Sequence, residues 1–148
     1  MRTVLYAAAA FCLTAVPAWA EPAWCSAAPQ AGAQPFTVET PEGFTLEVAG
    51  QADDAVTWAL RRGDDVYVGI YVGNNAHFAA SNPGDVLVDD PRRQRRVRMA
   101  SGALGQRPVE YLYETGCKTW PTQIHVWAHP LPVLSLEAER LAGTVKPK

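Results

Sequence analysis

The pattern that most restricts the fold of this chain lies in residues 56–72, where apolar residues occupy every second position. Val56, Trp58 and Leu60 follow this spacing, and the alternation resumes after Gly63 and continues to Val72. Successive side chains of a strand point to opposite faces, so a period of two is typical of a strand with one buried face. The sequence therefore predicts two antiparallel strands joined by a tight turn at Gly63.

Other parts of the chain repeat this alternation, and turn-forming residues separate them. The further predicted strands cover residues 36–38, 44–48, 96–99, 109–113 and 124–128. Between residues 74 and 91 lies a long stretch that is rich in turn formers. Loops of this length in compact domains are usually functional or disordered, and we predict a loop here.

The period changes near the C-terminus, where apolar residues recur at i, i+4, i+7 and i+11. These residues are Leu134, Ala138, Leu141 and Val145. Ser135 is suited to cap the start of a helix and Gly143 to end it, so one short amphipathic helix is predicted. The sequence as a whole predicts an α+β fold for residues 36–148: an antiparallel sheet of about six to seven strands, with the C-terminal helix packed on one face to give two layers.

Three motifs occur in this order: "FTVETPEGF" at 36–44, "GQRPVEY" at 105–111 and "AERLAGTV" at 138–145. Together with the hairpin that carries Trp58, they resemble the PsbP/Mog1-like group of small secreted bacterial domains, over roughly residues 35–146. Members of that group are mostly accessory or binding modules, so the resemblance implies a role outside catalysis. It transfers no site residue, because this chain departs from the group in its cysteine pair, Cys25 and Cys117, and in an arginine-rich stretch at residues 92–98.

Residues 1–20 have the order of charge, apolar run and small residues that is typical of a secretory signal peptide. Arg2 is followed by an apolar run of about 14 residues, shorter than the roughly 20 that a membrane-spanning helix needs. Ala18 and Ala20 have the spacing of a cleavage site, which predicts removal between Ala20 and Glu21. We expect a periplasmic or secreted mature chain without a transmembrane segment.

Removal of the leader would take Cys12 away and leave Cys25 and Cys117. Two cysteines in a small exported domain usually form one disulfide, which here would tether an irregular N-terminal tail at residues 21–35. The chain-entropy model gives such a long loop about 4–5 kcal/mol of stabilisation. A reactive thiol pair is the alternative, but the C-x-x-C spacing is missing, as is the ligand spacing of a zinc site.

Charge argues against nucleic acid as a partner. The full chain has 13 basic and 15 acidic residues, and loss of Arg2 leaves 12 against 15, a net charge near −3. Local positive charge is nevertheless dense, at Arg92, Arg93, Arg95, Arg96 and Arg98. This cluster is interpreted either as the solvated face of a strand, which is typical of sheet edges, or as a docking site for an acidic protein or an anionic envelope component.

Aromatic rings also recur on the predicted strands, at Tyr67, Tyr71, Tyr111, Tyr113, His125 and Trp127. If these strands are neighbours, several of the rings would share the sheet face that the helix leaves uncovered. Tyr67, Tyr71 and Trp127 are therefore candidate partner-binding residues, together with the arginines. The alternative is that the rings complete the core.

No catalytic residue, cofactor or metal site is predicted. The chain lacks the G-x-S-x-G elbow and the phosphate-binding loops, and its paired aspartates fall at expected turns. His125 and His129 would share a metal ion if they lay on a helix, but four residues of a strand span about 13 Å.

Three classes of function remain open. The leading hypothesis is a non-enzymatic, exported binding or accessory domain that engages a protein or an anionic envelope component. The second is a periplasmic inhibitor or immunity-type protein. The third is a hydrolase, which would need a concave site that joins His77 or His125 to an acidic residue.

Overall fold

The structure is a computed structural model that describes residues 21–26, 28–30, 32–78, 85–90, 95–99, 109–129 and 136–148, with the backbone alone at 95–99. The predicted leader at residues 1–20 lies outside these ranges, and so do Arg92 and Arg93. Within the described ranges, no helix is long and apolar enough to cross a membrane.

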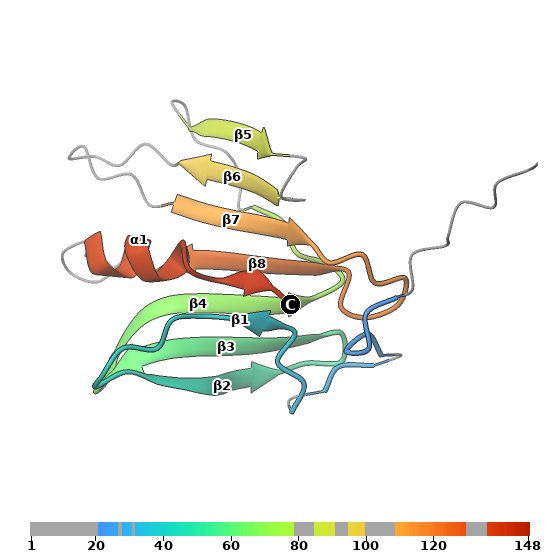
Figure 1. Cartoon of the computed structure of the whole chain (residues 1–148), viewed down its shortest axis with the longest axis horizontal. Coiled ribbons are helices and arrows are strands. Elements are labelled where there is room, and N and C mark those ends of the chain that lie inside the picture. Colours follow the sequence, from blue (N-terminus) through green and yellow to red (C-terminus); the bar gives the residue numbers. More distant parts are fainter. Residues whose placement is uncertain are drawn as a thin grey trace, which may run out of the picture.

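Seven antiparallel strands form one sheet, in the order β2-β3-β4-β8-β7-β6-β5 (Figure 1). Their bounds are β2 (Thr45–Gln51), β3 (Ala55–Arg62), β4 (Asp65–Gly73), β5 (Val86–Asp90), β6 (Arg95–Met99), β7 (Val109–Glu114) and β8 (Gln123–Ala128). A second, two-stranded sheet pairs β1 (Phe36–Thr37) with β9 (Lys146–Pro147). The predicted antiparallel sheet with a C-terminal helix, and hence the α+β class, is confirmed.

The hairpin predicted from the alternation is β3–β4, and its turn contains Gly63 in the left-handed region at φ 59°. The register shifts by one residue between Leu60, which pairs with Val68, and Arg61, which pairs with Val66. This β-bulge leaves Tyr67 as the extra residue, so the simple alternation does not fix the face on which its ring lies.

One face of the large sheet carries a second layer, made of α1 (Leu136–Ala142) and the β1–β9 pair (Figure 1). We call this the covered face. Leu141 of α1 and Phe36 of β1 are completely buried, whereas Leu136 at the start of the helix is 83% exposed. The Gly143 amide donates to the Glu139 carbonyl at 3.0 Å and ends the helix, as its sequence position predicted.

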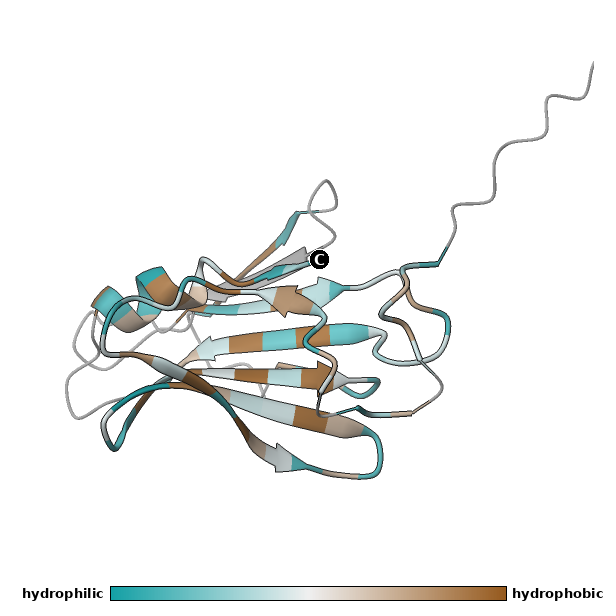
Figure 2. Cartoon of the chain, turned by 60° about the horizontal axis from the view of Figure 1, so that its bottom comes forward, coloured by the Kyte–Doolittle hydropathy of each residue, from teal (hydrophilic) through white to brown (hydrophobic). Residues whose placement is uncertain are grey.

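A continuous apolar core fills the space between the two layers. It includes Phe36, Phe44, Val56, Trp58, Leu60, Val68, Ile70, Val72, Ile124, Val126, Leu141 and Val145. Bands of apolar and polar residues alternate along the strands in Figure 2, as expected where only one face of an antiparallel sheet is buried. Burial of this core is the main stabilising contribution to the fold.

The N-terminal tail is joined to the sheet through the predicted disulfide, which the structure confirms between Cys25 and Cys117, with their Cα atoms 5.6 Å apart. Ser26 and Trp120 exchange two backbone hydrogen bonds of 2.8 and 2.9 Å next to it. The Trp120 ring is buried, and its Nε1–H donates to the Asp54 carbonyl at 3.0 Å. Covalent, backbone and side-chain contacts thus hold the tail at one end of the sheet.

Two features differ from the sequence prediction. The 74–91 stretch is not a loop throughout, because Val86, Leu87 and Val88 form an apolar run that pairs with β6 as strand β5. As a result, the arginine strand β6 lies between β5 and β7 and is not the sheet edge. The small strand β9 was also missed, because two residues are too few to show a period.

Candidate functional site

The second face of the sheet, which we call the open face, carries a cluster of polar and aromatic residues on β4, β8 and β7. Cross-strand register places Tyr71 opposite His125, Gly69 opposite Trp127, and Trp127 in turn opposite Glu110. Residues directly opposite each other in a sheet share a face, so these side chains lie together.

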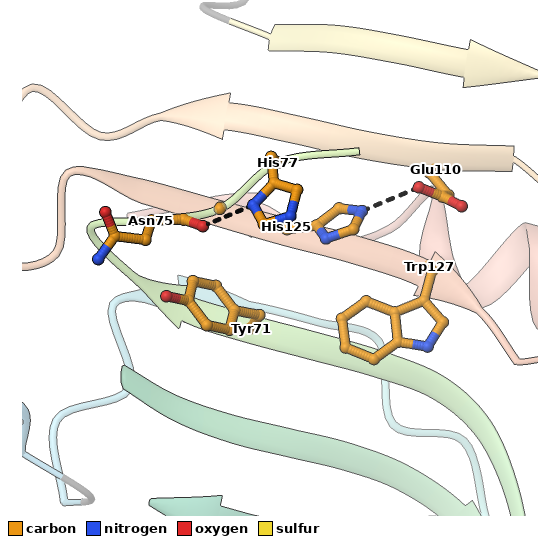
Figure 3. A pocket seen from close by; sticks show the side chains of 7 residues that line it. Tyr71, Asn75, His77, Glu110, His125 and Trp127 are labelled. Atoms are coloured by element: carbon orange, nitrogen blue, oxygen red, sulfur yellow. Dashed lines mark hydrogen bonds and ion pairs between the residues drawn. The ribbon is translucent and has the colours of Figure 1, made fainter. Parts of the chain in front are cut away.

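A pocket of about 390 Å³ opens on this face (Figure 3). Its lining consists of Tyr71, Asn75, Ala76, His77, Glu110, His125 and Trp127. We call it the open-face pocket. Its volume falls within the range of about 300–1,000 Å³ that is usual for small-molecule sites. The lining comes from three neighbouring strands and from the segment that follows β4, which forms a wall beside the strands.

Trp127 forms the floor of the pocket because Gly69 leaves room for its indole. A Cβ atom at position 69 would lie 2.2 Å from Cε2 and 2.3 Å from Cζ2 of Trp127, closer than any side chain allows. The ring therefore lies against the backbone of β4, as Figure 3 shows. Its other face is turned toward the pocket.

Tyr71, like Trp127, lies against a glycine of β4. A Cβ atom at Gly73 would lie 2.6 Å from the Tyr71 hydroxyl oxygen and 2.8 Å from the Asp54 carbonyl oxygen, so the glycine leaves space for the phenol. Burial raises the pKa of Tyr71 above its usual value of 10.0, and the nearby charge of Asp54 raises it further, while a hydrogen bond with the Asn75 backbone opposes the shift. The phenol is therefore neutral at physiological pH.

His125 and Glu110 form a hydrogen-bonded pair at the side of the pocket. The distance from Nε2 of His125 to Oε2 of Glu110 is 3.0 Å, and the two side chains are only 14% and 16% exposed. The carboxylate is an acceptor, so Nε2 carries the proton and Nδ1 is an acceptor when the ring is neutral. The imidazole also contacts the Trp127 ring at 5.2 Å and the edge of Phe78 at 5.6 Å between centroids.

Hydrogen bonds to the sheet hold the wall segment at residues 74–78 in place. The Asn75 side-chain amide donates to the Asp54 carboxylate at 2.6 Å, and the Thr122 backbone amide donates to the Asn74 side chain at 3.0 Å. Nδ1 of His77 lies 3.0 Å from the Asn75 carbonyl. Since a carbonyl only accepts, His77 is protonated at Nδ1 and offers Nε2 as an acceptor in the neutral ring.

The structure divides the predicted aromatic set between the two faces. Tyr71, His125 and Trp127 meet in the open-face pocket. Tyr67 packs against Phe44 in the core, at a centroid distance of 5.0 Å, because of the β-bulge. Tyr113 and Tyr111 lie on the covered face, where the Tyr113 hydroxyl donates to the Val145 carbonyl at 2.8 Å.

No arginine is among the described residues that line the pocket, although the register sets Arg98 of β6 opposite Glu110 of β7. Arg95, Arg96 and Arg98 are in β6, and their backbones pair with Asp90, Asp89 and Leu87 of β5. Opposite charges at facing positions of two strands are mutually favourable, so this register offers part of the arginine cluster partners within the chain. Arg92 and Arg93 fall outside the described residues.

Sequence reasoning gave no role to Glu110 or Asn75. The signal that could have found the site is the alternation of glycine with tyrosine at positions 69, 71 and 73, because glycine on a strand often marks a close approach by another group. His129, by contrast, lies beyond the end of β8, where its backbone amide donates to the Tyr67 carbonyl at 2.8 Å. It does not line the pocket.

Among the described residues, one group of three potential metal ligands has its ligand atoms within 4.8 Å of one another, namely Glu21, Cys25 and Cys117. The two sulfur atoms are bonded to each other, so neither is a thiolate that could hold a metal ion. This group therefore belongs to the tether of the tail.

Comparison with known proteins adds no assignment: no family model, no curated protein and no solved structure matches this chain. The functional evidence for this chain therefore lies in the geometry of the open-face pocket.

Proposed function

We propose that this protein is a small exported binding domain that recognises its ligand or partner at the open-face pocket, without turnover. The leader-like residues 1–20 and the disulfide between Cys25 and Cys117 support a periplasmic or secreted location after cleavage between Ala20 and Glu21. The resemblance to PsbP/Mog1-like domains points to the same class of accessory or binding modules.

The observation that carries this proposal is the contrast between a fully packed core on one face and an aromatic recess on the other. Trp127 and Tyr71 are large rings that stability alone would place in the core, yet they line a pocket that opens to solvent. Aromatic residues in a recess with a few convergent polar groups are typical of binding sites. Glu110, His125 and His77 supply those polar groups here.

Electrostatics narrows the proposal. The seven described lining residues include one carboxylate and neither lysine nor arginine, so none of them supplies a positive charge for an anionic ligand. A partner that the arginines attract would bind at β6, which lies beside β7 and its residue Glu110. The open-face pocket is therefore proposed to bind a neutral or donor-rich group of its partner.

A capture experiment with three proteins tests this proposal. Oxidised protein comprising residues 21–148 is immobilised as wild type, as Trp127→Ala and as Trp24→Ala, the last a matched tryptophan removal in the N-terminal tail. After exposure to envelope extract, each captured molecule is purified and its direct binding is measured. Binding that is lost with Trp127→Ala and kept with Trp24→Ala supports the proposal, and binding that is equal in all three proteins refutes it.

A second candidate function is a hydrolase, because the pocket does join His125 to an acidic residue. A neutral imidazole oriented by Glu110 could act as a general base toward water. The captured molecule distinguishes the two functions. If wild-type protein cleaves it and Glu110→Gln and His125→Ala still bind it but do not cleave it, the protein is a hydrolase; an unchanged ligand supports the binding domain.

A further inference from the structure

We infer that the open-face pocket binds a neutral saccharide, which stacks one face of a sugar ring on the indole of Trp127. This inference rests on the proposed function and specifies the chemistry of its ligand. Three properties of the site support it: the orientation of the rings, the kind of polar atom at the edge of the pocket, and the charge of the lining.

The first property is that the rings lie along the sheet and do not surround a central point. Trp127 lies on Gly69, and Tyr71 leans toward Gly73. These glycines are four positions apart on β4, which corresponds to about 13 Å along the strand. The floor is therefore elongated, with His125 between the two rings and tilted by 44° to the Trp127 indole (Figure 3).

The exposed face of the Trp127 indole selects ligands with a flat, weakly positive face. The face of an aromatic ring is the negative side of its quadrupole, so it attracts C–H groups that point toward it. One face of a pyranose ring presents several such C–H groups in nearly one plane. An isolated cation would instead be favoured by rings arranged around it together with a carboxylate that has no partner, whereas the Glu110 carboxylate is held by His125.

The second property is that acceptors dominate the polar edge of the pocket. Nδ1 of His125 is an acceptor in the neutral ring, and so is Nε2 of His77, because the other nitrogen of each ring donates within the protein. A ligand that fits this edge must bring hydrogen-bond donors. Sugar hydroxyl groups are donors placed around the rim of a ring whose face is apolar.

The third property is the charge of the lining. With neutral histidines, the seven lining residues contain a single charge, the carboxylate of Glu110. That carboxylate already accepts from His125, and phosphate or sulfate groups would find no lysine or arginine among those seven residues. An aromatic side chain of a protein partner could stack on Trp127 but would leave the acceptor nitrogens of His77 and His125 without donors. A neutral saccharide satisfies both the floor and the edge.

The test is a titration of oxidised protein comprising residues 21–148, followed by NMR at the indole N–H of Trp127. The probes are three neutral tetrasaccharides: cellotetraose, maltotetraose and tetra-N-acetylchitotetraose. Tetragalacturonate represents acidic ligands, the deacetylated chitosan tetramer represents cationic ligands, and N-acetyltryptophanamide represents an aromatic side chain. We expect saturable binding of at least one neutral probe and weaker or absent binding of the other three.

Two variants and one control show whether the assigned site is responsible. Trp127→Ala should weaken binding by about tenfold or more, as should Gly69→Ala, which keeps the indole but tilts it off the strand. Trp24→Ala should bind as the wild type does. Melting curves and near-wild-type amide spectra verify that each variant folds.

The outcomes separate this inference from the proposed function. If no neutral saccharide binds, or if a comparator binds more tightly, the inference is wrong, while capture that depends on Trp127 would still support a binding domain. If a neutral saccharide binds equally well to Trp127→Ala, the inference is again wrong, because the ligand uses another part of the protein.

Discussion

The two faces of the large sheet are built from the same strands but differ in which residue types they carry and in how deeply these are buried. On the covered face, β4 and β8 contribute Ile70, Val72 and Val126, all completely buried beneath α1 and the β1–β9 pair. On the open face, glycine alternates with aromatic residues along β4, and the rings of Tyr71 and Trp127 occupy the space above the glycines. The covered face is packed against a second layer of protein. On the open face, the absence of side chains at Gly69 and Gly73 leaves the space that the two rings occupy.

Because of this difference, we expect different residues to determine the stability of the fold and the binding of a ligand. Burial of apolar area stabilises the fold mainly through the covered face, at about 25 cal/mol per Å². The open face buries Leu112 and Ala59 but contributes less to that term, because its pocket remains in contact with water. We therefore expect substitutions on the covered face and in its tether to change the free energy of unfolding, and substitutions in the pocket to change binding.

The largest change in the free energy of unfolding is expected from removal of the disulfide, which stabilises the fold independently of how either face is packed. Replacement of both Cys25 and Cys117 by serine should lower the free energy of unfolding by about 4–5 kcal/mol, because a loop with a sequence separation of 92 residues regains its freedom in the unfolded state. Urea denaturation of the variant and of the oxidised wild type measures this. A loss below about 1 kcal/mol would mean that the covered face and the other tail contacts suffice.

The next effect concerns the covered face itself. Leu141→Ala should cost about 2–5 kcal/mol of unfolding free energy, because Leu141 is completely buried and its removal leaves a cavity. Leu136→Ala in the same helix is the matched control, since Leu136 is 83% exposed, and it should stay within about 0.5 kcal/mol of the wild type. Equal losses of unfolding free energy in both variants would show that packing of the buried side of α1 against the sheet does not stabilise the fold.

A smaller effect on stability is expected on the open face. Gly69→Ala would force the Trp127 indole off β4, but the ring can move into the pocket, so the unfolding free energy should change by no more than about 1 kcal/mol. The Trp127 indole N–H resonance should nevertheless shift strongly. Gly50→Ala is the control, because a Cβ atom there meets nothing within 4 Å. A loss from Gly69→Ala as large as that from Leu141→Ala would remove the distinction between the faces.

The smallest effect concerns the titration of Tyr71. Burial raises its folded-state pKa above 10.0, so its contribution to stability is fully present below about pH 10 and is lost as the pH rises through the folded-state pKa. Tyr71→Phe, which has no phenol to ionise, should lose less stability than the wild type between about pH 10 and 12. Thermal unfolding in this range measures the difference, and parallel pH profiles would show that Tyr71 is as solvated as a free tyrosine.

The sequence predicted the parts of the fold that have a period. The β3–β4 hairpin, the strands around residues 109–113 and 124–128, the C-terminal helix and the disulfide are all present. Strand β5 was missed because the run of Val86, Leu87 and Val88 does not alternate and follows several turn formers. Strand β5 lies at the edge of the sheet and pairs only with β6, so its formation depends on a partner strand and not on a pattern within residues 86–90.

The site was predicted only in fragments. Tyr71 and Trp127 were candidates from the alternation, but Tyr67 was assigned by the same argument and lies in the core, because one extra residue at the β-bulge changes the face. Strand order also decides which residues meet, and Glu110 reaches His125 only because β7 and β8 are neighbours. Neither a bulge nor strand order has a local signature in the sequence, so the pocket could not be assembled from the sequence alone.

Asp54 takes part in both the tether and the pocket. Its carbonyl oxygen accepts from Trp120, which lies three residues after Cys117, and its carboxylate holds Asn75 in the pocket wall. The tether of the tail and the wall of the pocket therefore meet at one residue. Replacement of Asp54 by asparagine would leave its backbone carbonyl for Trp120 but remove the carboxylate that holds Asn75, so the wall of the pocket would be weakened without breaking the tether.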